Sequence, residues 1–256
     1  MNRRFEFVLQ FNQADLAGDI DKIIESCPGL NALTIGHKNE VIESNIRFTE
    51  TFYSNLTASR IESLTFIGQT FQSTDLSYFS DFIEKSKTLT LTLEKNYYNE
   101  FDLSVFFESF SKSRIKEFSF TDLFETQHET AHETASLSRS LSRINLDKLK
   151  YTRFVIEFEH SHSELLNIEH VVLSKLSNYH ESVERFLVAL KHSKVRFLEI
   201  NVFGRFVQIA LDGGIKEWVS ETNLELFLIR GQFKEEHQQV FRYVNKNGVE
   251  SSLIIE

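Results

Sequence analysis

The residues with the most suggestive chemistry are His128, Glu129 and His132, which form the run His-Glu-Thr-Ala-His. This spacing matches the zinc-protease pattern H-E-x-x-H. On a helix, the two imidazoles lie one turn apart and can bind one zinc ion, with Glu129 as the general base. A third ligand would have to come from further along the chain, and the candidates are Glu157, Glu159 and His160. The motif leaves a zinc-dependent hydrolase open as one class of function.

The surroundings of this motif favour a different interpretation. The tetrapeptide His-Glu-Thr-Ala occurs twice in succession at 128–135, and a tandem duplication produces the H-E-x-x-H pattern by accident. The neighbouring side chains Gln127, Thr130 and Glu133 are polar, whereas a zinc-protease helix is packed into a core. We therefore expect a solvated insertion here, with no catalytic metal and no other cofactor.

Two further groups of residues could carry chemistry. His160 and His162 lie close in sequence to Glu157 and Glu159, but an exposed turn explains this cluster better than a metal site. Cys27 is the only cysteine, and we expect it to be a small buried residue because no neighbouring His is evident to activate a thiol. The chain has no Walker loop, dinucleotide fingerprint or G-x-S-x-G elbow. We therefore predict that the protein is not an enzyme.

Short strand-like runs recur along the chain and would position these residues. Each has apolar residues at relative positions one, four and six, with mostly polar or small residues between them, and the clearest span 30–35, 61–66, 115–120, 195–200 and 224–229. Less regular runs occupy 88–93 and 151–156, while 5–11 and 253–255 would form the first and last strands. Apolar residues at helical spacing precede most strands, at 20–24, 48–56, 76–83, 103–110, 183–190 and 207–219.

This alternation resembles the leucine-rich-repeat proteins, in particular the long repeats of the ribonuclease-inhibitor subtype. The resemblance covers about residues 20–256 and implies an α/β solenoid, a curved horseshoe with parallel strands on the concave face and helices on the convex face. The chain would then be a single domain over 1–256. Members of the family often place an Asn at position nine, where its side chain bonds to turn backbone. Asn96 occupies that position here, and Gln69 and Gln232 occupy the equivalent one.

The distances between repeats are irregular. Measured at position four from Leu33 to Phe227, they are 31, 27, 27, 36, 44 and 29 residues. The two longest repeats indicate insertions around 121–150 and 159–182, and such excursions are frequent places for specific contacts. A (β/α)8 barrel is the alternative fold, but its loops usually need more turn residues than the 9 Gly and 1 Pro of this chain.

Composition restricts the partners and the compartment. The net charge of -9 argues against binding to nucleic acid, and a partner whose binding segment is basic suits it better. No run approaches the roughly 18 apolar residues of a membrane span, and the N-terminal residues alternate as in a strand rather than a signal peptide. With one cysteine, a reducing compartment is expected, which places the protein in the cytoplasm or nucleus.

Side chains at positions three, five and seven of each strand should share the concave face. Those with the chemistry to bind a partner are Glu94, Glu117, Arg153, Glu157, Phe197, Glu199, Leu226, Leu228 and Arg230. Acidic groups around exposed apolar side chains would suit a basic, partly hydrophobic protein segment. The sequence therefore predicts a non-enzymatic interaction module, an adaptor or a subunit, that binds another protein through the concave sheet and the long insertions.

Overall fold

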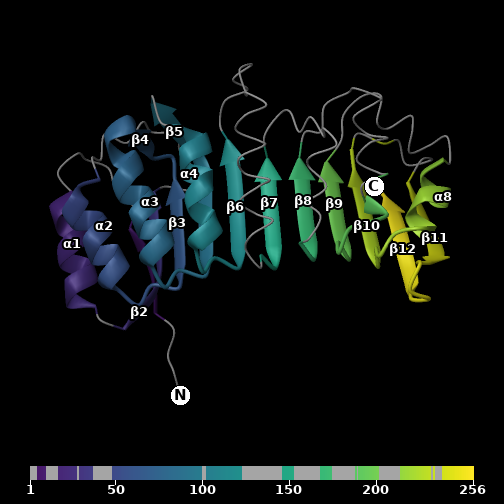
Figure 1. The fold of residues 1–256 in the computed structure, drawn as a ribbon, viewed down its shortest axis with the longest axis horizontal. Helices are drawn as coiled ribbons and strands as arrows, with labels where there is room; N and C mark the ends of the chain where they lie inside the picture. Colours follow the sequence, from purple (N-terminus) through teal and green to yellow (C-terminus); the bar gives the residue numbers. More distant parts are fainter. Residues whose placement is uncertain are drawn as a thin grey trace. The chain divides into compact units, whose positions relative to one another are not determined.

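A computed structural model describes residues 5–9, 17–27, 29–36, 48–99, 102–122, 146–152, 168–174, 188, 190–201, 214–231, 233 and 238–256 (Figure 1). The chain divides into two compact units, Met1–Thr126 and Gln127–Glu256, which we call the N-terminal unit and the C-terminal unit. Both are built on a sheet whose strands are largely parallel, so the predicted α/β class is confirmed. Of the helices that the structure describes, none is long and apolar enough to cross a membrane.

In the N-terminal unit the strands lie in the order β1-β2-β3-β5-β6, with all neighbours parallel. The short strand β4 extends this arrangement by pairing with the end of β5. The strands are β1 (Phe5–Leu9), β2 (Leu30–Gly36), β3 (Ser63–Ile67), β4 (Thr70–Gln72), β5 (Thr90–Asn99) and β6 (Glu117–Asp122). Every strand predicted in this half of the sequence is present, whereas β4 was not predicted.

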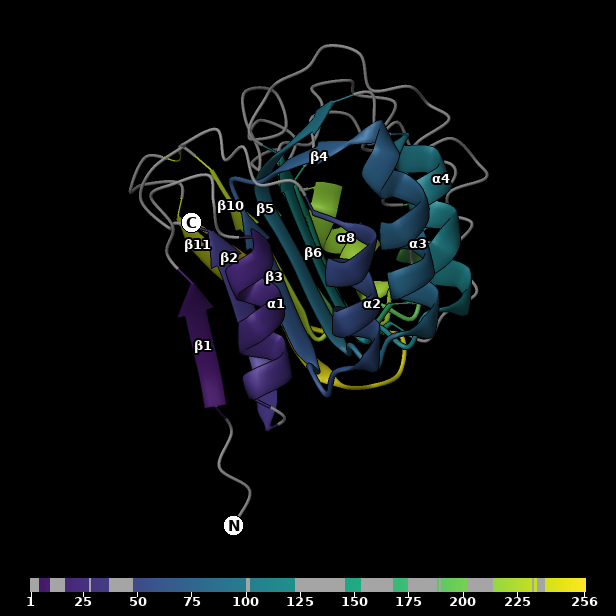
Figure 2. The ribbon, with the colours of Figure 1, turned by 90° about the vertical axis from the view of Figure 1, so that its left-hand side faces the viewer.

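Four helices connect these strands and lie on one side of the sheet (Figure 2). They are α1 (Ala17–Ser26), α2 (Glu50–Ala58), α3 (Leu76–Lys85) and α4 (Leu103–Ser109), with 3-10 turns η1 (Ser73–Asp75) and η2 (Phe110–Lys112). Side chains fix where they begin: Thr49 Oγ1 accepts a hydrogen bond from the N–H of Phe52, and Asp102 Oδ1 accepts one from the N–H of Ser104. The four predicted helical segments are confirmed.

Aromatic side chains fill the space between these helices and the sheet. Phe79 of α3 contacts rings from the helices on both sides and from the sheet, with centroids 5.5 Å from Tyr53, 5.1 Å from Phe71 and 4.9 Å from Phe106. The rings with under 2% exposure, or at that limit, are Phe52, Tyr53, Phe66, Phe71, Phe79, Phe82, Phe106, Phe107, Phe110, Phe118 and Phe120. Much of the chain's total of 25 Phe residues is therefore concentrated in one core.

The C-terminal unit repeats the parallel arrangement in the order β7-β8-β9-β10-β12, and β11 completes it antiparallel to β12. Its core is mostly aliphatic, for example Leu149, Val171 and Leu198. The elements are β7 (Lys148–Thr152), β8 (His170–Ser174), β9 (Phe197–Asn201), α8 (Gly214–Ser220), β10 (Leu226–Arg230), β11 (Gln239–Val244) and β12 (Glu250–Ile255). Most of the helix predicted at 183–190 lies outside the described residues.

Two strands differ from the sequence prediction. The strand predicted at 151–156 overlaps β7 only at residues 151 and 152, since β7 begins at Lys148 and has Leu149 at position four, and 153–156 lie outside the described residues. Strand β8 lies inside the stretch 159–182 that was expected to be an insertion, and it pairs on both sides. Apolar residues do occupy positions one, four and six of β7 and of β8. The pattern is hard to recognise in the sequence because the charged or polar residues Lys148, Lys150 and His170 lie between them. With these strands, position-four residues from Leu33 to Leu253 follow one another at intervals of 22 to 31 residues.

A recurring Ser or Thr precedes the strands in both units and was not predicted. It lies two residues before position one, and its side-chain oxygen accepts a hydrogen bond from the N–H two residues later at Ser59, Ser86, Ser113, Ser193 and Thr222. At Ser59, Ser193 and Thr222 the hydroxyl also donates to the carbonyl three residues earlier. The same turn therefore leads from helix to strand in both units.

Asn96 behaves as its position in the repeat predicts. Its side chain is fully buried, Oδ1 accepts a hydrogen bond from the N–H of Gln69 at 2.8 Å, and Nδ2 donates to the carbonyl of Phe66 at 3.1 Å. The Gln69 side chain in turn donates to the carbonyl of Ile67 at 2.7 Å. These bonds satisfy the backbone where two neighbouring strands turn outward, which confirms the predicted bonding of Asn96 to turn backbone.

Candidate binding face

Each sheet has one face of buried side chains and one face that is partly exposed. Positions four and six of the described strands are buried, as in Leu64, Phe66 and Leu198. Positions three, five and seven lie on the opposite face because side chains alternate along a strand. We call this partly exposed surface the N-terminal face in the first unit and the C-terminal face in the second. The pairing places position-three, position-five and position-seven residues of neighbouring strands in rows, as predicted.

The N-terminal face is small and rich in hydroxyl groups. Its rows are Ala32, Ser63, Thr90 and Glu117; then Thr34, Thr65, Thr92 and Ser119; then Gly36, Ile67, Glu94 and Thr121. The two acidic side chains, Glu94 and Glu117, form no salt bridge with any described residue. Gly36 has a φ of 127°, and a Cβ there would lie 2.0 Å from the carbonyl oxygen of Ile67, so the strands approach too closely for a side chain.

The C-terminal face is larger and more apolar. One row contains Lys148, His170, Phe197, Leu226, Ser252 and Arg242, and the next contains Lys150, Val172, Glu199, Leu228, Ile254 and Val240. The side chains of Phe197, Leu226, Leu228 and Ile254 are half-buried. Val240 is 66% exposed and Val244, on the same side of β11, is 57% exposed. Exposed apolar side chains in adjacent strands form a continuous surface, which is the feature that marks interaction sites.

The structure brings five of the predicted partner-binding residues together on the C-terminal face. Phe197 and Glu199 on β9 lie directly beside Leu226 and Leu228 on β10, and Arg230 follows on β10. Glu94 and Glu117 lie on the N-terminal face. Arg153 and Glu157 lie outside the described residues, as do His128 and His132 of the zinc-protease pattern. Among the described residues, no cluster of three or more His, Cys, Asp or Glu could hold a metal ion.

Glu199 is not the free acid that the sequence suggested. Arg230 Nε lies 3.1 Å from Glu199 Oε1, and Arg230 Nη1 lies 3.4 Å from Glu256 Oε1. One guanidinium therefore engages two carboxylates on the C-terminal face. Because Arg230 already neutralises Glu199, this pair cannot contribute an acidic centre to the face.

Several residues of the C-terminal face were not predicted. Ile254 and Val240 extend its apolar surface, Val172 lies in the same row but is only 8% exposed, and Lys148 and Lys150 add positive charge at β7. The missed strand β8 and the misplaced β7 account for three of these. The apolar residues at positions one, four and six of 168–173, together with a spacing of about 27 residues, would have indicated β8.

A ladder of opposite charges runs along the start of three strands of the C-terminal unit. Arg196 lies between Glu169 and Glu225: its Nε and Nη2 donate to the two carboxylate oxygens of Glu225 at 2.7 and 2.9 Å, and its Nη1 donates to Glu169. The hydrogen bonds from Arg196 hold the pKa of the Glu225 carboxyl below its usual value, and the Glu225 carboxylate raises the pKa of Arg196. All three side chains are substantially exposed, so this ladder aligns strands more than it stabilises them.

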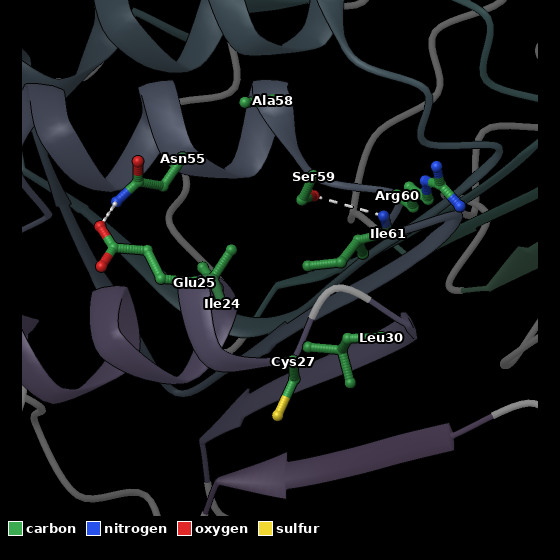
Figure 3. A pocket seen from close by; sticks show the side chains of 9 residues that line it. All are labelled: Ile24, Glu25, Cys27, Leu30, Asn55, Ala58, Ser59, Arg60 and Ile61. Carbon is green, nitrogen blue, oxygen red and sulfur yellow. Dashed lines mark hydrogen bonds between the residues drawn. The ribbon is translucent and has the colours of Figure 1, made fainter.

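A small cavity of about 240 Å³ lies between α1 and α2, and Cys27 is at its edge (Figure 3). Cys27 is half-buried rather than fully buried as expected. Across the cavity, Asn55 Nδ2 donates to Glu25 Oε1 at 3.5 Å. The nine lining residues include no histidine, so none of them supplies an imidazole base for the thiol. The cavity therefore offers no catalytic arrangement.

No protein-family model matches this sequence, and no curated protein matches it. Function must therefore be inferred from the residues of the two faces.

Proposed function

We propose that this protein is a non-enzymatic interaction module, an adaptor or subunit, that binds another protein through the partly exposed faces of its sheets. In this proposal the units form a leucine-rich-repeat-like solenoid, with positions three, five and seven on its concave side. The recurring helix-to-strand turn with Ser or Thr, and the buried Asn96 at the strand ends, support a stacked repeat. Stacked repeats commonly bind partners along an extended concave surface.

The single observation that carries this proposal is the group Phe197, Leu226 and Leu228 on adjacent strands. These side chains remain half-exposed although the opposite face of the same strands is fully buried. A contiguous apolar surface of this kind is costly to leave in water, and a bound protein would cover it. Each such side chain that a partner buries completely would contribute on the order of 1 kcal/mol or more to affinity.

The N-terminal face would contribute a different kind of contact. Glu94 and Glu117 have no basic partner among the described residues, so a basic segment of the bound protein would suit this face. The proposed contribution of the insertion at 121–150 remains a prediction, because 123–145 lies outside the described residues.

Affinity capture from a native lysate with two matched variants tests this proposal. Leu226→Thr/Leu228→Thr removes apolar surface from the C-terminal face, whereas Val105→Thr/Val188→Thr removes apolar surface elsewhere, at side chains that are more exposed, 45% and 47%. We expect one partner to be captured by wild type and by the control, and to be lost with the Leu variant at equal thermal stability. Equal capture by all three proteins would contradict binding through this face.

The zinc-dependent hydrolase at His128, Glu129 and His132 stays as the alternative function. Metal content after purification separates the two: stoichiometric zinc that is lost in His132→Ala would favour the hydrolase. We expect no stoichiometric zinc in either protein.

A further inference from the structure

We propose that the C-terminal face binds a protein segment in which apolar side chains are flanked by acidic residues. This inference rests on the proposed function and specifies the chemistry of the partner at that face. It differs from the sequence-based expectation of a basic partner, which relied on the net charge of -9 and on Glu94, Glu117, Glu157 and Glu199.

Unpaired positive charges lie at both ends of the C-terminal face. Lys148 and Lys150 are on β7, the first strand of the C-terminal unit, and Arg242 is on β11, the last in the strand order. Lys150 and Arg242 are exposed and Lys148 is half-exposed. None of the three forms a salt bridge with a described residue, so their charge is available to a partner.

The acidic groups of the same face are partly neutralised. Glu199 and Glu256 are both bound by Arg230, whose one positive charge balances one of the two carboxylates. Glu250, at the start of β12, is the one acid of the described face without a salt bridge. The four cations Lys148, Lys150, Arg230 and Arg242 therefore face the three carboxylates Glu199, Glu250 and Glu256, which leaves a net charge of +1 on these side chains in a chain whose net charge is -9. This local excess of positive charge is the opposite of what the composition of the whole chain predicts.

The apolar side chains lie between these cations. Along the sheet order from β9 to β11, the face presents Phe197, then Leu226 and Leu228, then Ile254 and Val240. Neighbouring strands are about 4.8 Å apart, so the five intervals from β7 to β11 span roughly 24 Å. An extended segment of roughly seven residues crosses this distance. Its apolar side chains would supply the affinity, and its acidic ends would pair with Lys150 and Arg242 to fix its direction.

Peptide display tests this directly. A random 12-residue peptide library is panned against the intact protein, and enriched peptides are synthesised and titrated by fluorescence anisotropy. The test variant is Lys148→Glu/Lys150→Glu. The control is Lys87→Glu/Lys194→Glu, which makes the same change in net charge at two exposed lysines that form no salt bridge with described residues and lie outside the face. Thermal unfolding verifies that both variants are folded.

We expect enriched peptides to combine Leu, Phe or Ile with flanking Asp or Glu, and to bind the test variant about tenfold or more weakly than the control, with affinity falling as salt rises. Enrichment of Lys- and Arg-rich peptides, or equal binding to both variants, would overturn the inference. If such basic peptides are lost with Glu94→Lys/Glu117→Lys, the proposed function stands and only this inference fails. If no peptide is enriched, both fail. Displacement of the peptides by oligothymidine at low micromolar concentration would point to nucleic acid and also overturn it.

Discussion

The two units are built with the same repeat but present different surfaces. In both, position four is buried and a Ser or Thr precedes the strand, as at Ser59 and Ser193. The N-terminal unit combines an aromatic core with a face of hydroxyl groups, whereas the C-terminal unit combines an aliphatic core with an apolar face. The buried positions are constrained because each strand must fit its neighbours. The faces are not constrained by the fold in this way, so their difference points to separate contacts.

The largest effect should come from the aromatic core of the N-terminal unit. Phe79→Ala removes a fully buried ring that contacts Tyr53, Phe71 and Phe106, and it should lower the free energy of unfolding by about 3–5 kcal/mol. Leu198→Ala, in the aliphatic core, should cost about 2–3 kcal/mol. Urea denaturation followed by circular dichroism measures both. A loss below that of Leu198→Ala would mean that the aromatic cluster relaxes around the cavity and does not set the stability of its unit.

The next effect concerns one buried asparagine in each unit. Asn96 bonds to the backbone of Gln69 and Phe66, and the side-chain oxygen Oδ1 of Asn245 accepts from the N–H groups of Asn247 and Val249 at 2.9 and 3.1 Å. Replacing either by Ala leaves buried backbone groups, at Asn96, or part-buried ones, at Asn245, without these partners and should cost about 1–3 kcal/mol.

Urea denaturation of the two Asn variants is the measurement, with Asn247→Ala as the control. The Asn247 side chain makes an exposed hydrogen bond to Asn223, so its removal should cost less than either buried asparagine. An Asn96→Ala protein as stable as this control would show that water replaces the lost bonds.

The sequence was sufficient to predict most of the repeat because burial at positions one, four and six leaves a visible pattern. Strands β2, β3, β5, β6, β9 and β10 were predicted on that basis, and helices α1 to α4 were predicted from apolar residues at helical spacing. The prediction began too late at β7, which starts at Lys148, because Phe154–Ile156 have a higher β propensity than Lys148–Thr152. Strand β8 was not predicted, because the stretch 159–182 that contains it was expected to be an insertion. Spacing between repeats was a better guide there than local propensity.

The candidate face was predicted only in part. The alternation of side chains was enough to place Phe197, Leu226 and Leu228 on one surface, since this follows from strand geometry alone. The sequence could not predict which charged side chains of the face are free to contact a partner, because salt bridges form between side chains of different strands. The pairing of Arg230 with Glu199 and Glu256 is such a case, and it changes the expected charge of the partner.

A smaller effect should test whether the helix-to-strand turn is equivalent in the two units. Ser59→Ala and Ser193→Ala each remove one hydroxyl that donates to a carbonyl and accepts from an N–H. We expect each to lower the free energy of unfolding by about 1 kcal/mol. Ser193 is buried and Ser59 is only half-buried, so the loss should be somewhat greater at Ser193. If only one of the two variants has a lower free energy of unfolding, the turns share their geometry but do not contribute equally to stability.

The smallest effect should come from the charge ladder of the C-terminal unit. Arg196→Gln removes the donors that Glu225 and Glu169 accept from, and a slightly lower melting temperature is expected at low salt. The pKa of Glu225 is lowered in the folded protein, so the stability from this pair is present above the ordinary pKa of Glu and is lost as pH falls through the lowered value. The difference in melting temperature between Arg196→Gln and wild type should therefore shrink below pH 4 and in 1 M NaCl. The N-terminal unit has no counterpart of this ladder among its described residues. The guanidinium of Arg196 also lies over the ring of Phe197, at 5.4 Å from its centroid. A difference in melting temperature that persisted at high salt would therefore indicate that Arg196 stabilises the C-terminal unit by packing on Phe197.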